Sequence, residues 1–356
     1  MNMEEIKIQQ TDIRKAKPDQ SNLPFGHYFT DHMFLLDYNL EQGWHEPRIV
    51  PYAPLVLDPA AMVFHYGQAV FEGMKAFIAK DEQILLFRPN KNMERFNQSN
   101  RRLEIPEIDG DFIIHAIQKL VNVDKEWIPS GKGTSLYIRP FIIATEACLG
   151  VRASHTYQLL VILSPVGAYY SEGLEPVKIN VESSYTRAVR GGLGTAKAAG
   201  NYAASIKAQT EAKDAGYSQV LWLDAIEKKY IEEVGSMNIF FKINGKVITP
   251  ELNGSILAGV TRDSIMELLN NWGVPVEERQ ISIEEVYEAS LNGTLEEVFG
   301  TGTAAVISPV GELFWNNHQM IVNQGHIGQL SQKLYDTITG IQTGLIPDTL
   351  HWTVQV

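Results

Sequence analysis

A stretch rich in turn-forming residues near the middle of the chain most constrains the fold that this sequence can adopt. It runs from Pro165 to Pro176 and holds two glycines as well, a composition typical of a connection between domains. At 356 residues the chain exceeds the size that one hydrophobic core usually serves. We therefore predict an N-terminal domain over 1–164, a connection over 165–176 and a C-terminal domain over 177–356.

Charge and cysteine content limit the partners and the compartment. The net charge of −12 argues against nucleic acid or an anionic membrane surface as the main partner, although an acidic chain can still hold a cationic pocket. The sequence has no run of about 20 apolar residues and no signal peptide, so no membrane span is predicted. The single cysteine, Cys148, fits a reducing compartment. We predict a cytoplasmic protein.

The first half has the periodicity of an α+β domain. A helix is predicted to begin at Pro89 and to end before Pro106, and Asp111 is the predicted N-cap of the next helix. Alternating residues predict strands over 33–39, 83–87, 135–144 and 157–163.

In the second half, strands and helices alternate more regularly. Asn244-Gly245 predicts a hairpin, and Ser282 with Glu285 forms a capping box that predicts a helix start. Further helices are predicted over 201–214, 261–270 and 326–341. Strands are predicted over 177–181, 220–223, 230–233, 238–243, 246–249, 296–299 and 304–308.

Several common kinds of site are excluded by their missing motifs. The nine histidines form neither an HExxH motif nor a Cys/His cluster, so no metal site is predicted. The stretch that begins at Gly192 is not a dinucleotide fingerprint, because Lys197 stands where the third glycine belongs. A Gly-x-Ser-x-Gly elbow is also missing, which argues against a serine hydrolase.

Lys197 itself is the first candidate for chemistry. It stands among small residues between Gly191 and Gly200, and these let other groups approach its amine closely. A lysine that acts as a nucleophile needs such surroundings, although one lysine in a Gly/Ala loop is ordinary in a large chain.

Two glycine-bearing loops are candidate anion sites. The loop 253–261 leads directly into a helix, whose N-terminus suits a phosphate monoester; alternatively Thr261 is only the cap of that helix. The turn 300–305 can direct backbone N–H groups and two hydroxyl groups at an anion, or can be purely structural.

Two further charged features remain. Tyr137 and Arg139 share one face of a predicted strand, where the arginine requires a carboxylate from the substrate or from an internal Asp or Glu. One of Glu232 and Glu233 must point inward and be paired, unless both are solvated at an edge. A lysine, phosphate-ready loops, an inward carboxylate and an arginine together match the needs of pyridoxal phosphate chemistry.

Ordered motifs from about residue 25 to the C-terminal helix extend this match. They are Phe25 to Met33, His65 to Ala76, Phe87-Arg88-Pro89, Tyr137 to Pro140, Gly200-Asn201-Tyr202, Glu233 to Asn238 and Gly300 to Ala304. In this set the chain resembles the branched-chain amino-acid aminotransferases, fold-type IV pyridoxal-phosphate enzymes, in their larger bacterial and animal form. The resemblance implies an α+β, two-domain fold like that of the D-amino-acid aminotransferases, with a smaller α/β N-terminal domain and a larger pseudo-barrel C-terminal domain.

The resemblance also implies the cofactor site. Lys197 matches the lysine that binds pyridoxal 5′-phosphate as a Schiff base and moves the substrate proton. Tyr202 matches the partner of the cofactor's phenolic oxygen, and Glu233 the carboxylate facing its pyridine nitrogen. The residues that match the phosphate and ring contacts are Arg88, Leu257, Val260, Thr261 and Thr303, with Arg187 nearby.

On the substrate side, the resemblance implies an aromatic pocket with one arginine at its rim. Arg139 matches the residue that receives the side-chain carboxylate of glutamate, while the backbone of Thr303 and Ala304 matches the grip on the α-carboxylate. The pocket residues are Phe25, Tyr66, Phe71, Tyr137 and Tyr169. Leu149 and Val151 match a loop that closes the neighbouring subunit's pocket, which implies a homodimer.

The expected reaction is transamination of L-leucine, L-isoleucine and L-valine with 2-oxoglutarate, giving branched-chain 2-oxo acids and L-glutamate. A Cys-x-x-Cys pair that some animal relatives carry is missing here, because Ala304 to Ser308 stands at that place. Alternatives of the same fold are a D-amino-acid aminotransferase and an aminodeoxychorismate lyase; a carrier without turnover is the alternative of another class.

Overall fold

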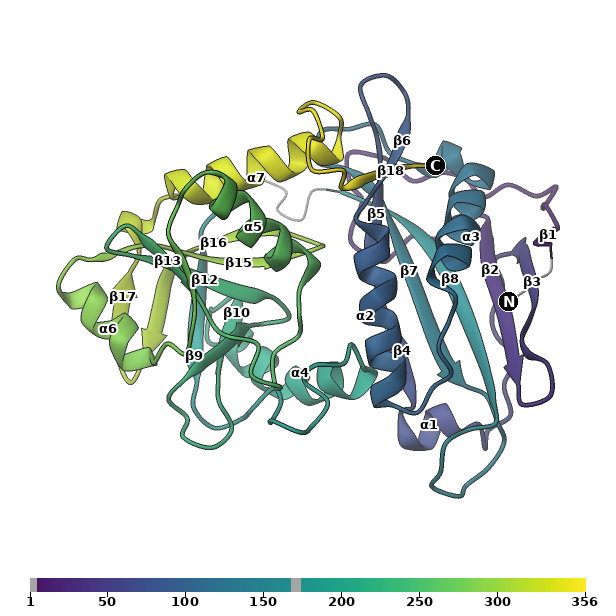
Figure 1. The fold of residues 1–356 in the computed structure, drawn as a ribbon, viewed down its shortest axis with the longest axis horizontal. Coiled ribbons are helices and arrows are strands. Elements are labelled where there is room, and N and C mark those ends of the chain that lie inside the picture. Colours follow the sequence, from purple (N-terminus) through teal and green to yellow (C-terminus); the bar gives the residue numbers. More distant parts are fainter. Residues whose placement is uncertain (1–4, 168–173) are drawn as a thin grey trace. The chain divides into compact units, whose positions relative to one another are not determined.

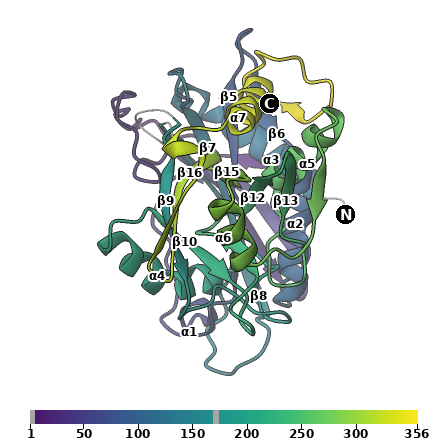
Figure 2. The ribbon, with the colours of Figure 1, turned by 90° about the vertical axis from the view of Figure 1, so that its left-hand side faces the viewer.

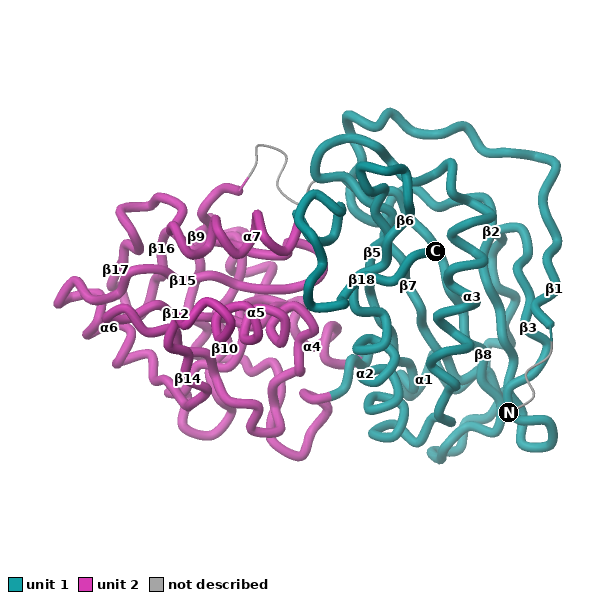
Figure 3. Tube along the Cα trace, turned by 45° about the horizontal axis from the view of Figure 1, so that its top comes forward, with its two compact units in different colours: residues 1–169, 196–199, 340–356 teal, residues 170–195, 200–339 magenta. Residues whose placement is uncertain are grey.

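The structure is a computed structural model that describes residues 5–167 and 174–356. The chain forms two compact units, coloured separately in Figure 3. Unit 1 comprises residues 1–169, 196–199 and 340–356, and unit 2 comprises residues 170–195 and 200–339. Residues 168–173 of the predicted connection lie outside the described part of the chain.

The ends of the units differ from the predicted boundaries in two places. Residues 340–356 belong to unit 1, because β18 (Thr353–Gln355) pairs antiparallel with β6 (Ile84–Phe87). The segment 196–199 also belongs to unit 1, so Lys197 is grouped with the first half of the chain. Both differences come from pairings between residues far apart in sequence.

Unit 1 is built on a mostly antiparallel sheet (Figure 1). The strand order is β1-β3-β2-β8-β7-β5-β6-β18, and β4 pairs with β7. Besides β6 and β18, the strands are β1 (Lys7–Ile8), β2 (His32–Asn39), β3 (Gly43–Pro51), β4 (Ala69–Phe71), β5 (Met74–Ile78), β7 (Ser135–Ala144) and β8 (Thr156–Val166). The helices of the first half are α1 (Met62–Tyr66), α2 (Pro89–Arg102) and α3 (Gly110–Val123), followed by the 3-10 turn η1 (Lys125–Trp127).

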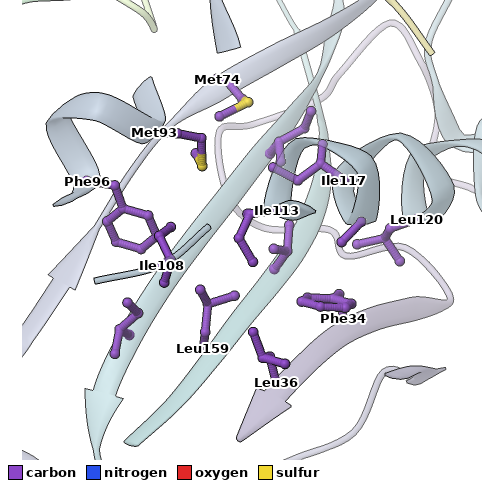
Figure 4. Close-up of a cluster of buried hydrophobic side chains, with 14 of the residues drawn as sticks. Phe34, Leu36, Met74, Met93, Phe96, Ile108, Ile113, Ile117, Leu120 and Leu159 are labelled. Atoms are coloured by element: carbon purple, nitrogen blue, oxygen red, sulfur yellow. The ribbon is translucent and has the colours of Figure 1, made fainter. Parts of the chain in front are cut away.

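The core of unit 1 lies between this sheet and the helices α2 and α3. Side chains of α3, such as Ile113 and Ile117, pack near Phe34, Leu36 and Leu159 of the sheet (Figure 4). On β7 the core residues are Leu136, Ile138 and Ile142. Because successive side chains of a strand point to opposite faces, Tyr137 and Arg139 lie on the face away from this core.

Unit 2 is built on a mixed sheet, seen from the side of α6 in Figure 2. Its order is β11-β10-β9-β16-β15-β12-β13-β14, and β17 pairs with β16. The strands are β9 (Val177–Glu182), β10 (Gln219–Leu223), β11 (Ile231–Val234), β12 (Asn238–Ile243), β13 (Lys246–Thr249), β14 (Val276–Glu278), β15 (Leu295–Gly302), β16 (Val306–Trp315) and β17 (His318–Ile321). The helices of the second half are α4 (Ala199–Asp214), α5 (Val260–Asn271), α6 (Ile283–Leu291) and α7 (Gln329–Gln342), with the 3-10 turn η2 (Asn323–Gly325) before α7.

Local turn and cap signals were only partly confirmed. Asn244 and Gly245, with φ of 50° and 73°, join β12 and β13 as predicted, and the Ser282 hydroxyl accepts the Glu285 N–H at 3.0 Å. The cap predicted at Asp111 was wrong: α3 is capped by Asp109, whose carboxylate accepts from a backbone N–H in the first turn. Asp111 instead lies within that first turn. The fold is mixed α and β as predicted, with helices and strands in both units.

None of the helices in the described ranges combines the length and the apolar character that crossing a membrane requires.

Candidate active site

Lys197 lies in unit 1, in a short segment held at three backbone points. Its N–H donates to the Ser99 hydroxyl at 2.9 Å, and its carbonyl accepts from the Phe71 N–H at 3.1 Å. Next to it, Ala198 forms an isolated antiparallel bridge with Val70. The lysine backbone is therefore fixed against β4 and α2, and its side chain is half-buried.

The Phe71 ring brings two cations together. The Lys197 Nζ atom lies 4.7 Å from the centroid of this ring, and the Arg139 Cζ atom lies 4.7 Å from the same centroid. The two cationic groups are thus no farther apart than twice that distance. Arg139 also donates through Nη2 to the Tyr137 hydroxyl at 3.1 Å, and the Phe25 ring meets the Tyr137 ring edge-on at 4.8 Å. Five of the predicted residues therefore form one connected set.

Arg139 has no carboxylate partner within 4 Å among the residues that the structure describes. Its Nε atom is buried and has no hydrogen-bond partner there, while its guanidinium contacts only the rings of Phe71 and Tyr137 and the tyrosine hydroxyl. The internal Asp or Glu weighed as an alternative is not found in the described part of the chain. The half-buried guanidinium therefore has a hydroxyl and two aromatic rings around it, and its Nε hydrogen is left without an acceptor among the described residues.

The strand β5 runs beside Tyr137 and carries a buried lysine, Lys75. Lys75 is the register partner of Tyr137, and burial lowers the pKa of its ammonium to about 8. Two residues earlier, a Cβ added to Gly73 would lie 2.0 Å from the Tyr137 hydroxyl oxygen. Glycine at 73 therefore allows the tyrosine ring to lie over this strand.

A buried ion pair between Glu72 and Arg95, which the sequence analysis did not identify, interacts with the charge of Lys197. Glu72 is fully buried and forms a bidentate pair with Arg95 of α2, at 2.7 and 2.8 Å, while the Asn92 amide donates to it at 2.8 Å. Burial opposes the charged carboxylate, but Arg95, Lys197 and Asn92 together hold the pKa of Glu72 below its ordinary value. A usable signal existed: Asn92, Arg95 and Ser99 have the spacing of one helix face.

Arg88 has a strained backbone in unit 1. It is the N-cap of α2 with φ of 47° and ψ of 45°, in the left-handed region that few non-glycine residues adopt. Its N–H donates to the Trp352 carbonyl at 2.7 Å, and its guanidinium lies 5.0 Å from the centroid of the Trp352 ring. The C-terminal segment thus fixes the arginine that was predicted to bind phosphate.

The remaining unit 1 predictions concern the pocket rim. The Tyr66 hydroxyl donates to the Leu149 carbonyl, and both residues are exposed. Val151, on the same loop, is 85% exposed. Tyr169 lies outside the described residues.

In unit 2, Glu233 lies on β11 and is buried among polar partners. Its carboxylate is 2.6 Å from Nη1 of Arg187 and accepts from the Asn238 amide at 3.3 Å. The same two partners also hold the loop before α5: Arg187 donates to the Ser255 carbonyl at 3.3 Å, and Asn238 to the Leu257 carbonyl at 2.8 Å. The carboxylate and the loop carrying Leu257 are therefore positioned by one network. No sequence signal indicated the part played by Asn238, because that part depends on tertiary contacts.

The N-terminus of α5 has no side-chain cap. Its N-cap is Gly259, which provides no side-chain cap, so the alternative of Thr261 as the cap is not what the structure has. Val260 and Thr261 begin the helix, where backbone N–H groups have no partner within the helix. A Cβ on Gly259 would lie 2.0 Å from the Asn238 side-chain oxygen, so a larger residue at this cap would displace the Asn238 amide.

The turn between β15 and β16 carries Thr303 and Ala304, both half-buried. Just before it, Thr301 is the register partner of Asn238. The Thr301 hydroxyl is buried and has no hydrogen-bond partner among the described residues, so it is an unused polar atom next to this network.

Tyr202 lies in the first turn of α4 and is half-buried. The neighbouring Asn201 amide donates to the Leu193 carbonyl at 2.7 Å, which closes the glycine-rich stretch onto the helix. In the described part of the chain, no group of three or more His, Cys, Asp or Glu side chains is placed to hold a metal ion.

Comparison with known proteins gives consistent relatives. A family model described as amino-transferase class IV matches residues 69–313. The chain is 62% identical over 356 residues to branched-chain-amino-acid aminotransferase 2 of Bacillus subtilis (strain 168), covering 100% of this chain and 98% of that protein.

Two solved structures are similar over most of the chain. The crystal structure of the Escherichia coli branched-chain amino acid aminotransferase superposes with a TM-score of 0.77 at 28% identity, covering 91% of this chain and 99% of that one. The branched-chain amino acid aminotransferase from Thermobaculum terrenum, in its PLP-bound holo form, has a TM-score of 0.74 at 25% identity, covering 90% of this chain and 97% of that one.

Proposed function

The chain belongs to the class IV aminotransferase family, and we propose that Lys197 is the residue through which it holds its cofactor. It is a pyridoxal-phosphate-dependent transferase that transaminates branched-chain amino acids. The observation that carries the assignment of the lysine is the Phe71 ring, which lies 4.7 Å from both the Lys197 ammonium and the Arg139 guanidinium. A lysine for the amino group and an arginine for a carboxylate thus lie at one aromatic ring.

The residues of both units fit pyridoxal phosphate. Unit 2 offers the N-terminus of α5, which has no side-chain cap, for a phosphate, and also the Thr301 hydroxyl, which has no partner among the described residues. It also offers Glu233, oriented by Arg187 and Asn238, for the ring nitrogen. In the proposed site, Tyr202 would bond the phenolic oxygen, Leu257 would contact the ring, and the phosphate would be held by Arg88, Val260, Thr261 and Thr303.

Bound pyridoxal phosphate supplies an electron sink for negative charge at the substrate Cα. The protein's part is to hold groups and move one proton. The Lys197 amine would anchor the cofactor and, when free, would move the proton between the substrate Cα and C4′ of the cofactor. The backbone bonds of Lys197 to Ser99 and Phe71 limit where this amine can reach. Glu233 holds a proton at the ring nitrogen.

Arg139 explains how one pocket serves two kinds of substrate. A leucine side chain buries apolar surface against Phe25, Phe71 and Tyr137. The side-chain carboxylate of glutamate or 2-oxoglutarate pairs with the Arg139 guanidinium, whose Nε atom has no partner in the described residues. The backbone N–H groups of Thr303 and Ala304 receive the α-carboxylate. We take 2-oxoglutarate as the amino acceptor in this proposal.

The assembly belongs to the proposal as well. Leu149 is 66% exposed and Val151 is 85% exposed, and two aliphatic side chains on one loop favour a covered position. We infer a homodimer in which this loop meets the neighbouring subunit.

The two units correspond in this proposal to the two domains of the family, and the compartment is the cytoplasm. The alternatives of a D-amino-acid aminotransferase and an aminodeoxychorismate lyase are not favoured by the relatives.

The largest expected effect comes from removing the lysine amine. We expect Lys197→Ala to lower kcat/KM by about 10⁴-fold or more for both leucine and glutamate, because anchor and proton carrier are lost together. Steady-state kinetics with each donor measure this. Turnover of the variant at the normal rate would show that another group does the chemistry.

The substrate class is tested with a panel of amino donors. L-leucine, L-isoleucine, L-valine and L-glutamate should each change the visible absorption of the holoenzyme within milliseconds to seconds, and 2-oxoglutarate should restore it. D-alanine should leave the spectrum unchanged. A faster response to D-alanine than to L-leucine would refute the branched-chain assignment.

A further inference from the structure

Glu232 is a second buried carboxyl group, beside Glu233 on β11, and the proposed chemistry does not use it. The two residues are 4% and 2% exposed, so neither is a solvated edge residue. As neighbours on one strand they point to opposite faces. Glu233 is served by Arg187 and Asn238, whereas Glu232 contacts the hydroxyl of Ser255, in the loop before α5.

The Ser255 hydroxyl contacts two side-chain oxygen atoms but has only one hydrogen to donate. Its Oγ atom lies against Oε1 of Glu232 and is 2.6 Å from Oδ1 of Asn253. The Asn253 oxygen also accepts the Ser255 backbone N–H at 3.1 Å, which identifies that amide atom as the acceptor. A hydroxyl group has one hydrogen, so it can donate to only one of the two oxygens. The other contact needs a hydrogen from Glu232.

We propose that Glu232 is protonated in the native protein and acts as a positioning residue for the cofactor loop. Its carboxyl O–H donates to the Ser255 hydroxyl, which donates to the Asn253 side-chain oxygen. This chain of hydrogen bonds ties β11, the strand of Glu233, to the loop 253–259. The inference rests on the proposed function, in which that loop contributes Leu257 and the N-terminus of α5 to the cofactor site.

The surroundings of Glu232 support the neutral form. Burial raises the pKa of Glu232 above its ordinary value, and Asp224, from the turn after β10, acts in the same direction. The bond from Ser255 and the positive charges of Arg187 and Arg190 act against it. Burial is the largest of these effects, and the net shift is upward.

The loop is held tightly at Ser255 from other sides. A Cβ on Gly194, in the glycine-rich stretch before Lys197, would lie 2.0 Å from the Ser255 carbonyl oxygen. Arg187 donates to the same carbonyl. Ser255 itself is 1% exposed, so a lost hydrogen bond is not replaced by bulk solvent. A change at Glu232 is therefore transmitted to the loop backbone.

The sign of the pH effect follows from the raised pKa. An acid that is harder to ionise in the folded state contributes stability that is complete below its unfolded pKa, which is about 4.5. That contribution is lost as the pH rises through the folded value. Cofactor retention should also fall as the pH rises. When Glu232 is ionised, the single hydrogen of the Ser255 hydroxyl faces two acceptors, the Glu232 carboxylate and the Asn253 side-chain oxygen, so one of the two hydrogen bonds is lost.

The first test needs no cofactor. Infrared difference spectra between the wild-type apoprotein and Glu232→Gln at pH 6 to 7 should show the carbonyl stretch of a protonated carboxylic acid in the wild type. A difference spectrum with only carboxylate bands would overturn the proposal. Glu251→Gln, at an exposed glutamate near the same loop, is the matched control and should show carboxylate bands alone.

The second test follows cofactor retention during dialysis of the holoenzyme between pH 6 and 9. Ser255→Ala should release the cofactor about fivefold to tenfold faster, the effect of one buried hydrogen bond. Glu232→Gln, whose amide can donate as the neutral acid does, should stay within about twofold of the wild type and should lose the rise in release with pH. Thermal unfolding checks that each variant is folded.

The outcomes separate this inference from the proposed function. If Glu232→Gln releases the cofactor as fast as Ser255→Ala, Glu232 acts as a carboxylate and the inference is wrong. If no form of the protein binds pyridoxal phosphate, the proposed cofactor site fails, while the infrared result still decides the protonation of Glu232.

Discussion

Charged groups are treated differently in the two units. In unit 1, the half-buried Arg139 has no carboxylate partner among the described residues. In unit 2, the two neighbouring buried carboxyl groups, Glu232 and Glu233, each have a partner from the protein. In unit 1, Arg139 contacts only aromatic rings and one hydroxyl in the described part of the chain. In unit 2, Glu233 has an arginine and an amide, and Glu232 has a serine. In the proposal a substrate carboxylate would supply the missing partner of Arg139, whereas Glu232 and Glu233 already have partners from the protein.

The difference matches what each region must recognise. The proposed cofactor stays bound through every turnover, so preorganised partners lower the cost of holding it. Substrates alternate between one with an apolar side chain and one with a carboxylate. A guanidinium over an aromatic ring can accept either, because the ring stabilises the cation when no carboxylate is present. The internal pairing of Glu72 with Arg95 shows that unit 1 also pairs charges when they are structural.

The largest expected effect on stability comes from breaking the ion pair between Glu72 and Arg95 in unit 1. Arg95→Met leaves Glu72 charged and buried, and we expect the free energy of unfolding to fall by about 3–5 kcal/mol. Chemical denaturation measures the change. The control is Arg101→Met, which breaks an exposed pair with Glu107 and should cost about 1 kcal/mol or less. Similar losses for both variants would mean that Glu72 becomes protonated at little cost.

The next test removes the unpaired cation. Arg139→Leu should lower kcat/KM for glutamate and 2-oxoglutarate by about 10-fold to 100-fold, the effect of one charged hydrogen-bond partner. Leucine kinetics should change by about threefold or less. Stability should not fall, because no internal ion pair of the described residues is lost. Equal losses for both substrate classes would make Arg139 a structural residue.

A matched change in unit 2 sharpens the same comparison. Glu233→Gln removes a carboxylate that serves the cofactor rather than the substrate, so kcat for leucine and for glutamate should fall by the same factor, about 10²-fold or more. Parallel kinetics with both donors check this. A loss confined to one donor would place Glu233 in substrate selection.

The smallest expected effect concerns Lys75, the buried lysine beside Tyr137. Burial lowers the pKa of Lys75 to about 8, so its charged form costs stability below that pH. The cost disappears as the pH rises from about 8 toward the ordinary value of 10.5. Wild-type unfolding free energy should therefore rise over this interval relative to Lys75→Met. Parallel curves for the two proteins would show that the ammonium is not desolvated.

Two local signals in the sequence predicted local structure correctly, whereas the cap predicted at Asp111 was wrong because Asp109 caps α3. The Asn244-Gly245 turn and the Ser282 cap depend on neighbouring residues only, and both are present. Residue patterns made Lys197 and Arg139 candidates, and the resemblance to a family added Phe71; the structure brings the three side chains together. Spacing alone would have left Lys197 as an ordinary lysine in a glycine-rich loop.

Features that depend on distant residues were not predictable in this way. The short strand β18 was missed because its partner, β6, is more than 250 residues earlier in the chain. The partners of charged groups were also hidden: whether Arg139 meets an internal carboxylate, or which residue contacts Glu232, is decided by packing. The two adjacent glutamates illustrate this, because the sequence predicted one inward side chain and the structure buries both.

The central claim is that Lys197, and no other lysine, holds the cofactor. Borohydride reduction of the holoenzyme, followed by proteolysis and mass spectrometry, locates the modified lysine directly. The account predicts the pyridoxyl group on the peptide that contains Lys197 and an unmodified Lys75, despite the lowered pKa of that second lysine. A pyridoxyl group on Lys75, or one spread over several lysines, would contradict it.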